Sequence, residues 1–252
     1  MNDTPIIART AMLANLSISQ WSGRKYDKMA TQKLTASEGA QDDAARVNKL
    51  LMSKDTLGPP QKVASEVRTE FYRVTLPWGD NGDRILPALQ YTEFAEFVED
   101  KCREFDEKVD HLVSVYREEI ERARFRLQGL FSLDDYPAPG ELADKFRMRL
   151  SVRPIPTEHD FRINLADDVE DSIRSQVRAD IDRQTNAAVN HLWGRVGEML
   201  TTISQRLHDP DARFKGAMVD NFMELVDDLD KLNVTGDQKL IDLRNEVERN
   251  LL

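Results

Sequence analysis

The chain has 252 residues, of which 45 are acidic and 35 are basic, so its formal net charge at pH 7 is −10. This balance argues against a protein that coats DNA or RNA in general, because such proteins present a basic face. No stretch reaches the roughly 18 apolar residues of a membrane-spanning helix, and the first residues lack the pattern of a secretory signal. These observations predict a soluble protein without a membrane partner.

The first part of the chain is predicted to contain short elements. Apolar and polar residues alternate over residues 14–21, which is typical of a strand with one buried face. Short helices are predicted over residues 26–34 and 44–52, and Gly58-Pro59-Pro60 predicts a boundary before a helix over residues 61–74. The first of these helices carries its apolar residues on one side: Tyr26, Met29, Ala30 and Leu34.

Residues 75–87 are predicted to form an ordered loop. Two prolines and the glycines Gly79 and Gly82 mark tight turns, while Trp78 favours burial. The segment lacks the Lys-Ser/Thr of a phosphate-binding loop and the acid spacing of a calcium loop. A structural turn is therefore the favoured interpretation, and the residues that define this loop are Trp78, Asp80, Asp83 and Arg84.

Two long helices dominate the prediction. Apolar residues recur at steps of three and four over residues 91–130, which indicates one continuous helix whose seam faces a partner helix, as in a coiled coil. A second seam runs over residues 167–207, where the polar Gln184 interrupts the apolar row. The matched lengths predict that the two helices lie antiparallel.

Between the long helices, strand periodicity appears over residues 146–155 and again over residues 161–165. A β-hairpin is therefore predicted over residues 146–165, and the strand near the N-terminus is a candidate third member. Two shorter helices, over residues 211–232 and 237–252, close the chain. The predicted fold is mainly α with a small antiparallel sheet.

The chain shows no internal repeat and no low-complexity tract, which predicts a single elongated domain over residues 1–252. Its expected sub-parts are an N-terminal region of short elements (1–90), the long-helix hairpin with its β ribbon (91–207) and the C-terminal helices (208–252).

Four arginines of the predicted hairpin form a candidate interaction patch. Arg147, Arg149 and Arg153 fall at odd positions and share one strand face, to which Arg162 adds. A basic patch on an acidic protein suits a phosphate or an acidic partner. The alternative is an ordinary sheet surface whose charge is balanced by nearby acids, and the sequence leaves both open.

No catalytic or cofactor-binding signature is present. The four histidines form no HExxH pair, and the single Cys102 lies on a helical seam, where a buried, inert thiol is expected. His159 and Asp160 are either a catalytic pair or part of a turn. A carboxylate cluster for divalent-metal chemistry is an alternative interpretation of Asp160, Asp167, Asp168 and Asp171, but helix capping explains acids at a helix start. We predict no cofactor.

Several blocks of the sequence, taken together and in order, resemble an uncharacterised family of bacteriophage proteins. The blocks are residues 16–18, 21–27, 75–78, 82–87, 130–131, 135–137 and 155–162, with Phe214, Asn221 and Leu232-Asn233 near the end. The resemblance covers nearly the full chain but lies in loops and ends, and this domain of unknown function has no catalytic residues to transfer. It implies a phage origin, action in the host cytoplasm and, because relatives lie near genes for MoxR-type AAA ATPases and von Willebrand factor A proteins, an AAA ATPase partner.

We therefore expect a non-enzymatic interaction or scaffold protein that assembles with itself or with a phage or host protein. One alternative is an acidic inhibitor of a host or defence nucleic-acid enzyme, which would use the acidic helix faces. A second alternative is a metal-dependent nuclease or hydrolase built on the carboxylates named above.

Overall fold

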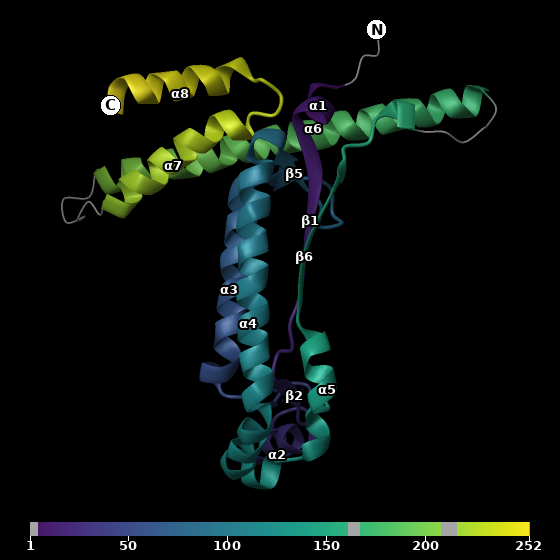
Figure 1. Cartoon of the computed structure of the whole chain (residues 1–252), viewed down its shortest axis with the longest axis vertical. Helices are drawn as coiled ribbons and strands as arrows, with labels where there is room; N and C mark the ends of the chain where they lie inside the picture. The colour runs from purple at the N-terminus through teal and green to yellow at the C-terminus, as the bar shows by residue number, and fades with distance from the viewer. Residues whose placement is uncertain (1–4, 161–166, 208–215, 252) are drawn as a thin grey trace. The chain divides into compact units, whose positions relative to one another are not determined.

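The structure is a computed structural model, and it describes residues 5–160, 167–207 and 216–251. The predicted fold class is confirmed, because the described chain is mainly helical with small antiparallel sheets (Figure 1). Both long helices are present as α4 (Ala88–Leu127) and α6 (Asp167–Leu207). Their bounds lie close to the predicted ranges, since apolar periodicity over many turns fixes a helix strongly.

The elements up to α4 are α1 (Ile6–Thr10), β1 (Ala11–Ser19), β2 (Arg24–Tyr26), α2 (Lys28–Glu38), β3 (Asn48–Leu50), α3 (Lys54–Val74), β4 (Leu76–Pro77) and β5 (Arg84–Pro87). After α4 come η1 (Gln128–Leu130), η2 (Leu133–Asp135), α5 (Pro139–Leu142), η3 (Ala143–Lys145), β6 (Arg147–Pro154), η4 (Glu158–Asp160), α6, α7 (Gly216–Leu232) and α8 (Gln238–Leu251).

The chain divides into two compact units. Unit 1 comprises Met1–Leu16, Thr69–Phe97 and Leu150–Leu252, and unit 2 comprises Ser17–Arg68 and Val98–Arg149. This division does not follow the sub-part boundaries predicted near residues 90 and 207. The single domain stays a prediction.

The four-stranded sheet has the order β4-β5-β1-β6. β1 is antiparallel to β5, with Ala11 opposite Pro87 and Ala14 opposite Arg84, and β5 is antiparallel to β4. The first strand of the predicted hairpin is β6, and its neighbour in the sheet is β1, the predicted candidate third member. The proposed second strand, residues 161–165, lies outside the described residues.

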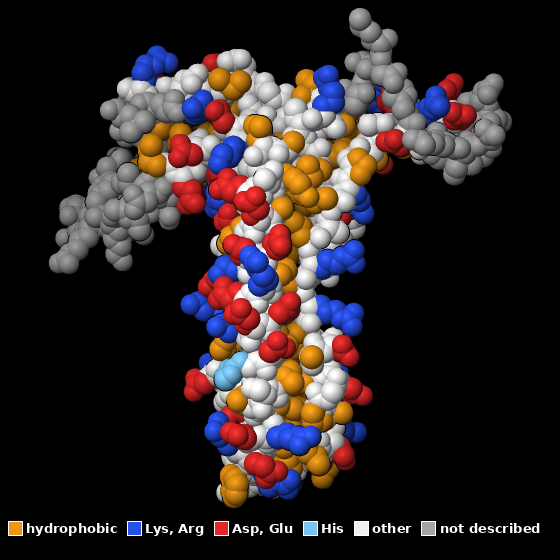
Figure 2. Space-filling view, viewed as in Figure 1, with side chains coloured by type: hydrophobic (Ala, Val, Ile, Leu, Met, Phe, Trp, Pro, Cys, Tyr) orange, Lys and Arg blue, Asp and Glu red, His pale blue; other side chains and the backbone are white. Residues whose placement is uncertain are grey.

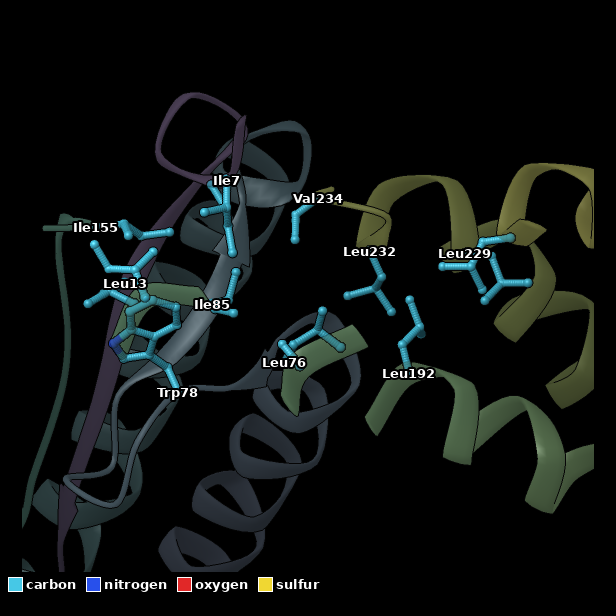
Figure 3. Close-up of a cluster of buried hydrophobic side chains, with 14 of the residues drawn as sticks. Ile7, Leu13, Leu76, Trp78, Ile85, Ile155, Leu192, Leu229, Leu232 and Val234 are labelled. Atoms are coloured by element: carbon cyan, nitrogen blue, oxygen red, sulfur yellow. The ribbon is translucent and has the colours of Figure 1, made fainter. Parts of the chain in front are cut away.

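The core of unit 1 joins the sheet to the helices α1, α6, α7 and α8. Leu13, Leu76 and Ile85 from the strands are buried with Leu192 of α6 and Leu232 of α7 (Figure 3). Along α6 the buried residues recur at steps of seven and four, so one face of this helix is covered within unit 1: Ile181, Ala188, Leu192 and Val196.

The core of unit 2 covers the seam of α4. The seam residues are fully or almost fully buried: Phe105, Val109, Leu112, Tyr116, Ile120 and Ala123. They share a cluster with Val63 and Ala64 of α3, with residues 51–57 and with residues 136–146. Each long helix thus has partners other than the one expected, because a periodic seam shows that a face is buried and does not identify what buries it.

Two local predictions are wrong. Residues 44–52 do not form a helix, because residues 48–50 are strand β3, which pairs with β2. Gly58-Pro59-Pro60 is not a helix boundary, because α3 begins at Lys54 and includes both prolines. In the second turn they remove only two helical hydrogen bonds, those to the carbonyls of Asp55 and Thr56, and the buried Pro60 adds packing.

The α4 seam gives a direct test of unit 2 stability. Replacing Phe105, which is fully buried, with alanine is expected to lower the free energy of unfolding by about 3–5 kcal/mol through lost burial and a cavity. Phe125→Ala on the same helix is the matched control, since Phe125 is 78% exposed, and should change stability by less than about 0.5 kcal/mol. Denaturant unfolding measures both, and equal losses would contradict the assigned seam.

Tyr116 gives a pH test of the same core. Its hydroxyl donates to the carbonyl of Pro137 at 3.0 Å, and burial raises the pKa of Tyr116 from 10.0 to about 12. Between pH 10 and about 12 the Tyr116 hydroxyl loses its proton in the unfolded chain and keeps it in the folded chain. The contribution of this hydroxyl to the free energy of unfolding is therefore complete below pH 10 and is lost as the pH rises to about 12. Phenolate absorbance should show this late titration, and Tyr116→Phe should remove it.

Candidate functional site

The segment 75–87 forms a tight hairpin of β4 and β5 in unit 1. Gly79 and Gly82 have φ angles of 57° and 83°, which suit glycine, and Trp78 is buried in the unit 1 core. Gln184, the polar residue that interrupts the α6 seam, accepts a hydrogen bond from the Gly79 N–H at 2.9 Å. Asp80 is exposed at the turn.

Asp83 of this hairpin is almost fully buried and carries a local charge network. Its carboxylate accepts a hydrogen bond from Asn15 Nδ2 at 3.2 Å and forms an ion pair with Arg153. A buried carboxylate requires such partners, since burial removes its hydration. Arg153 was predicted as part of the basic patch, and Asp83 as part of the 75–87 loop. The fold joins the two predictions, because Arg153 neutralises the charge of Asp83.

Two of the remaining patch residues lie on the same strand as Arg153. Arg147 and Arg149 are exposed on β6 within unit 2 and form no ion pair with any described residue. Arg162 lies outside the described residues. The patch as an interaction surface stays a prediction.

Arg84 and Arg195 lie at the C-terminal end of α3. Arg84 donates from Nε to Thr75 Oγ1 at 2.6 Å and from its terminal nitrogen to the Thr75 carbonyl at 3.1 Å, and its guanidinium covers the Tyr72 ring. Arg195 donates to the Arg73 carbonyl at 3.1 Å. Burial lowers the pKa of both arginines. Cations at the carbonyl end of a helix are a structural cap.

No metal centre is found among the described residues, where no three His, Cys, Asp or Glu side chains are placed to hold an ion. Asp160 accepts hydrogen bonds from the N–H and hydroxyl of Thr157, and Asp171 is exposed. The side chains of His159, Asp167 and Asp168 lie outside what the structure describes. Burial raises the pKa of the Cys102 thiol, which keeps it protonated at neutral pH.

The feature of unit 2 that the sequence did not indicate is a groove of about 640 Å³ beside α2. We call it the α2 groove, and it is lined by Tyr26, Asp27, Lys28, Met29, Ala30, Lys33, Lys49, Gly129, Leu130, Phe131 and Ser132. Tyr26 ends β2, Asp27 is the N-cap of α2, the next four residues belong to α2, Lys49 belongs to β3, and the last four come from the turn after α4. Apolar side chains on the groove are exposed: Tyr26 (40%), Met29 (65%) and Leu130 (46%).

Helix α2 buries two polar residues, while its exposed residues include apolar as well as polar and charged side chains. Thr31 and Thr35 are each only 2% exposed, whereas Met29 and Leu34 face solvent. Thr31 Oγ1 accepts the Val47 N–H at 3.0 Å and donates to the Asp27 carbonyl at 2.7 Å, so its burial is compensated by hydrogen bonds. The apolar side predicted for this helix is therefore its exposed side.

Lys49 joins the segments that form the groove. Its ammonium donates to the Leu130 carbonyl at 3.1 Å and forms ion pairs with Asp135 and, at 3.5 Å, with Asp27, the N-cap of α2. The hydrogen bond to Asp135 is the main cause that raises the pKa of Lys49. Lys28 and Lys33, by contrast, are exposed and form no ion pair with any described residue.

Comparison of the chain with family models, with curated proteins and with solved structures found no match. The resemblance to a phage family stays a prediction. Among the described residues, no helix is long and apolar enough to cross a membrane.

The Asp83 network is testable by a double-mutant cycle. Arg153→Ala is expected to lower the free energy of unfolding by about 1–3 kcal/mol, because the buried Asp83 carboxylate loses its cation. Asp83→Asn in the same chain should recover part of this loss, as expected for coupled residues. Arg149→Ala, on the same strand, is the control and should have almost no effect. Additive effects of the Arg153 and Asp83 substitutions would contradict the pairing.

Proposed function

We propose that this chain is a non-enzymatic interaction protein of a bacteriophage, which acts in the host cytoplasm by binding another protein through the α2 groove. The observation that carries the proposal is the inverted burial of α2. The helix buries two threonines and leaves Met29 and Leu34 in solvent, and Met29 lines the groove. An amphipathic helix normally buries its apolar side, and exposed apolar side chains that gather at a groove favour a binding surface.

The chemistry of the groove supports binding over catalysis. Asp27 is the only carboxylate among its lining residues, and no histidine or cysteine lines it. Asp27 accepts the Ala30 N–H at 2.9 Å as the helix cap and contacts Lys49, so its oxygens are engaged. The lining residues thus offer apolar contact and positive charge, without a free acid–base pair.

The resemblance in the sequence guides the choice of partner. It favours a phage or host protein, with an AAA ATPase as the first candidate, and it favours action during infection. The groove adds a surface through which such an assembly would form.

The acidic-inhibitor alternative receives less support from the described surface. The visible face of α4 carries acidic and basic side chains mixed together (Figure 2). Several of its acids pair with an arginine on the same helix, as Asp100 does with Arg103 and Glu121 with Arg124. A surface that imitates nucleic acid needs uninterrupted negative charge, which this arrangement reduces.

The proposal is tested by affinity capture from infected cells with three forms of the chain. The double variant Met29→Gln/Leu130→Gln should retain its partner at least about tenfold less than the wild type, because each substitution removes apolar contact area. Phe125→Gln, which changes an apolar residue of unit 2 that is 78% exposed and does not line the groove, is the matched control. Equal retention by all three forms would overturn the proposal.

A further inference from the structure

The α2 groove carries positive charge that the fold itself does not use. Lys28 and Lys33 line it, are exposed and pair with no described carboxylate. The acid beside them, Asp27, is already engaged by Lys49 and by the N–H of Ala30. The local surface is therefore cationic on a chain whose formal net charge is −10.

The position of Lys28 works against the helix that carries it. It is the first residue of α2, and the N-cap Asp27 is the one acid at this end, since the first turn itself contains none. A cation at a helix N-terminus is unfavourable because the helix dipole is positive there. A negatively charged ligand would remove this unfavourable interaction.

The apolar residues distinguish a peptide from a nucleic acid. Met29, Ala30 and Leu130 line the groove together with the lysines and offer contacts for an aliphatic or aromatic side chain. The two aromatic rings of the groove are less available for base stacking, because Arg46 covers a face of Tyr26 and Arg124 covers a face of Phe131, each at 4.6 Å.

We infer that the α2 groove binds an acidic segment of a partner protein, which seats an apolar side chain against Met29 and Leu130 and places carboxylates beside Lys28 and Lys33. This inference rests on the proposed function, since it names the chemistry of the partner that the groove receives. A second copy of this chain is a competing occupant, and its acidic segments are covered by the test below.

The test uses fluorescence polarisation with three labelled twelve-residue peptides as probes. All three probes have Leu and Phe four residues apart. The remaining positions are Asp and Glu in the acidic probe, Asn and Gln in the neutral probe, and Lys in the lysine probe. In low salt the wild type should bind the acidic probe about tenfold more tightly than the neutral probe, and the difference should shrink at high ionic strength.

Charge reversal identifies the lysines responsible. Lys28→Glu/Lys33→Glu should weaken binding of the acidic probe about tenfold and strengthen binding of the lysine probe. Lys54→Glu/Lys145→Glu is the matched control: both residues are exposed in unit 2, neither lines the groove, and Lys54 is likewise the first residue of its helix. This control should leave the affinity for the acidic probe almost unchanged.

Several results would overturn the inference. Equal affinity for the acidic and neutral probes would contradict binding of an acidic segment. Equal losses of affinity for the acidic probe in the two charge-reversal variants would contradict it as well. If a single-stranded oligonucleotide binds more tightly than the acidic probe, the groove is a nucleic-acid site and the inference is overturned. Self-association in sedimentation velocity that the Lys28→Glu/Lys33→Glu variant abolishes would assign it to a second copy.

The two proposals fail separately. If no peptide probe binds but Met29→Gln/Leu130→Gln still loses the partner captured from infected cells, the acidic occupant is overturned and the interaction function stands. If the acidic probe binds through the lysines but all variants capture the same proteins equally, the interaction function is overturned.

Discussion

The arrangement around the α2 groove depends on the ammonium of Lys49. Its side chain is 9% exposed, and a charge removed from water must be matched by opposite charge or by hydrogen-bond acceptors. Three segments supply them: the N-cap of α2 through Asp27, the turn after α4 through the Leu130 carbonyl, and η2 through Asp135. Because β3 carries this lysine, the pairing of β3 with β2 also positions the groove.

The long helices are the part of the fold that sequence periodicity predicts well. Repeated apolar steps over many turns identify α6 with the bounds observed and α4 within three residues at each end. Periodicity does not predict which residues pack against these seams. The unit 2 cluster includes residues 51–64, and the unit 1 cluster includes strands far away in the chain. The β3 strand was missed for a related reason: three residues are too short for a periodic signal, and only the distant β2 makes them a strand.

The candidate sites show the same limit. Arg153 and Asp83 are separated by 70 residues, and only the fold brings the predicted patch and the predicted loop into one ion pair. The groove was missed because the burial of Thr31 depends on the Val47 N–H, a contact across 16 residues. The spacing of Thr31 and Thr35, one helical turn apart, was the one available signal that the polar side of α2 faces inward.

Helix α2 therefore separates the residues that anchor it from the residues of the proposed binding surface. The threonines and the capping Asp27 hold the helix in place, while Lys28, Met29 and Lys33 contribute little to folding because they remain in solvent. Substitutions among these outward residues can alter the chemistry that the surface presents without disturbing the scaffold beneath it. Such a surface is free to diversify, because a few side chains on one short helix can be exchanged while the contacts that hold the helix in place stay the same.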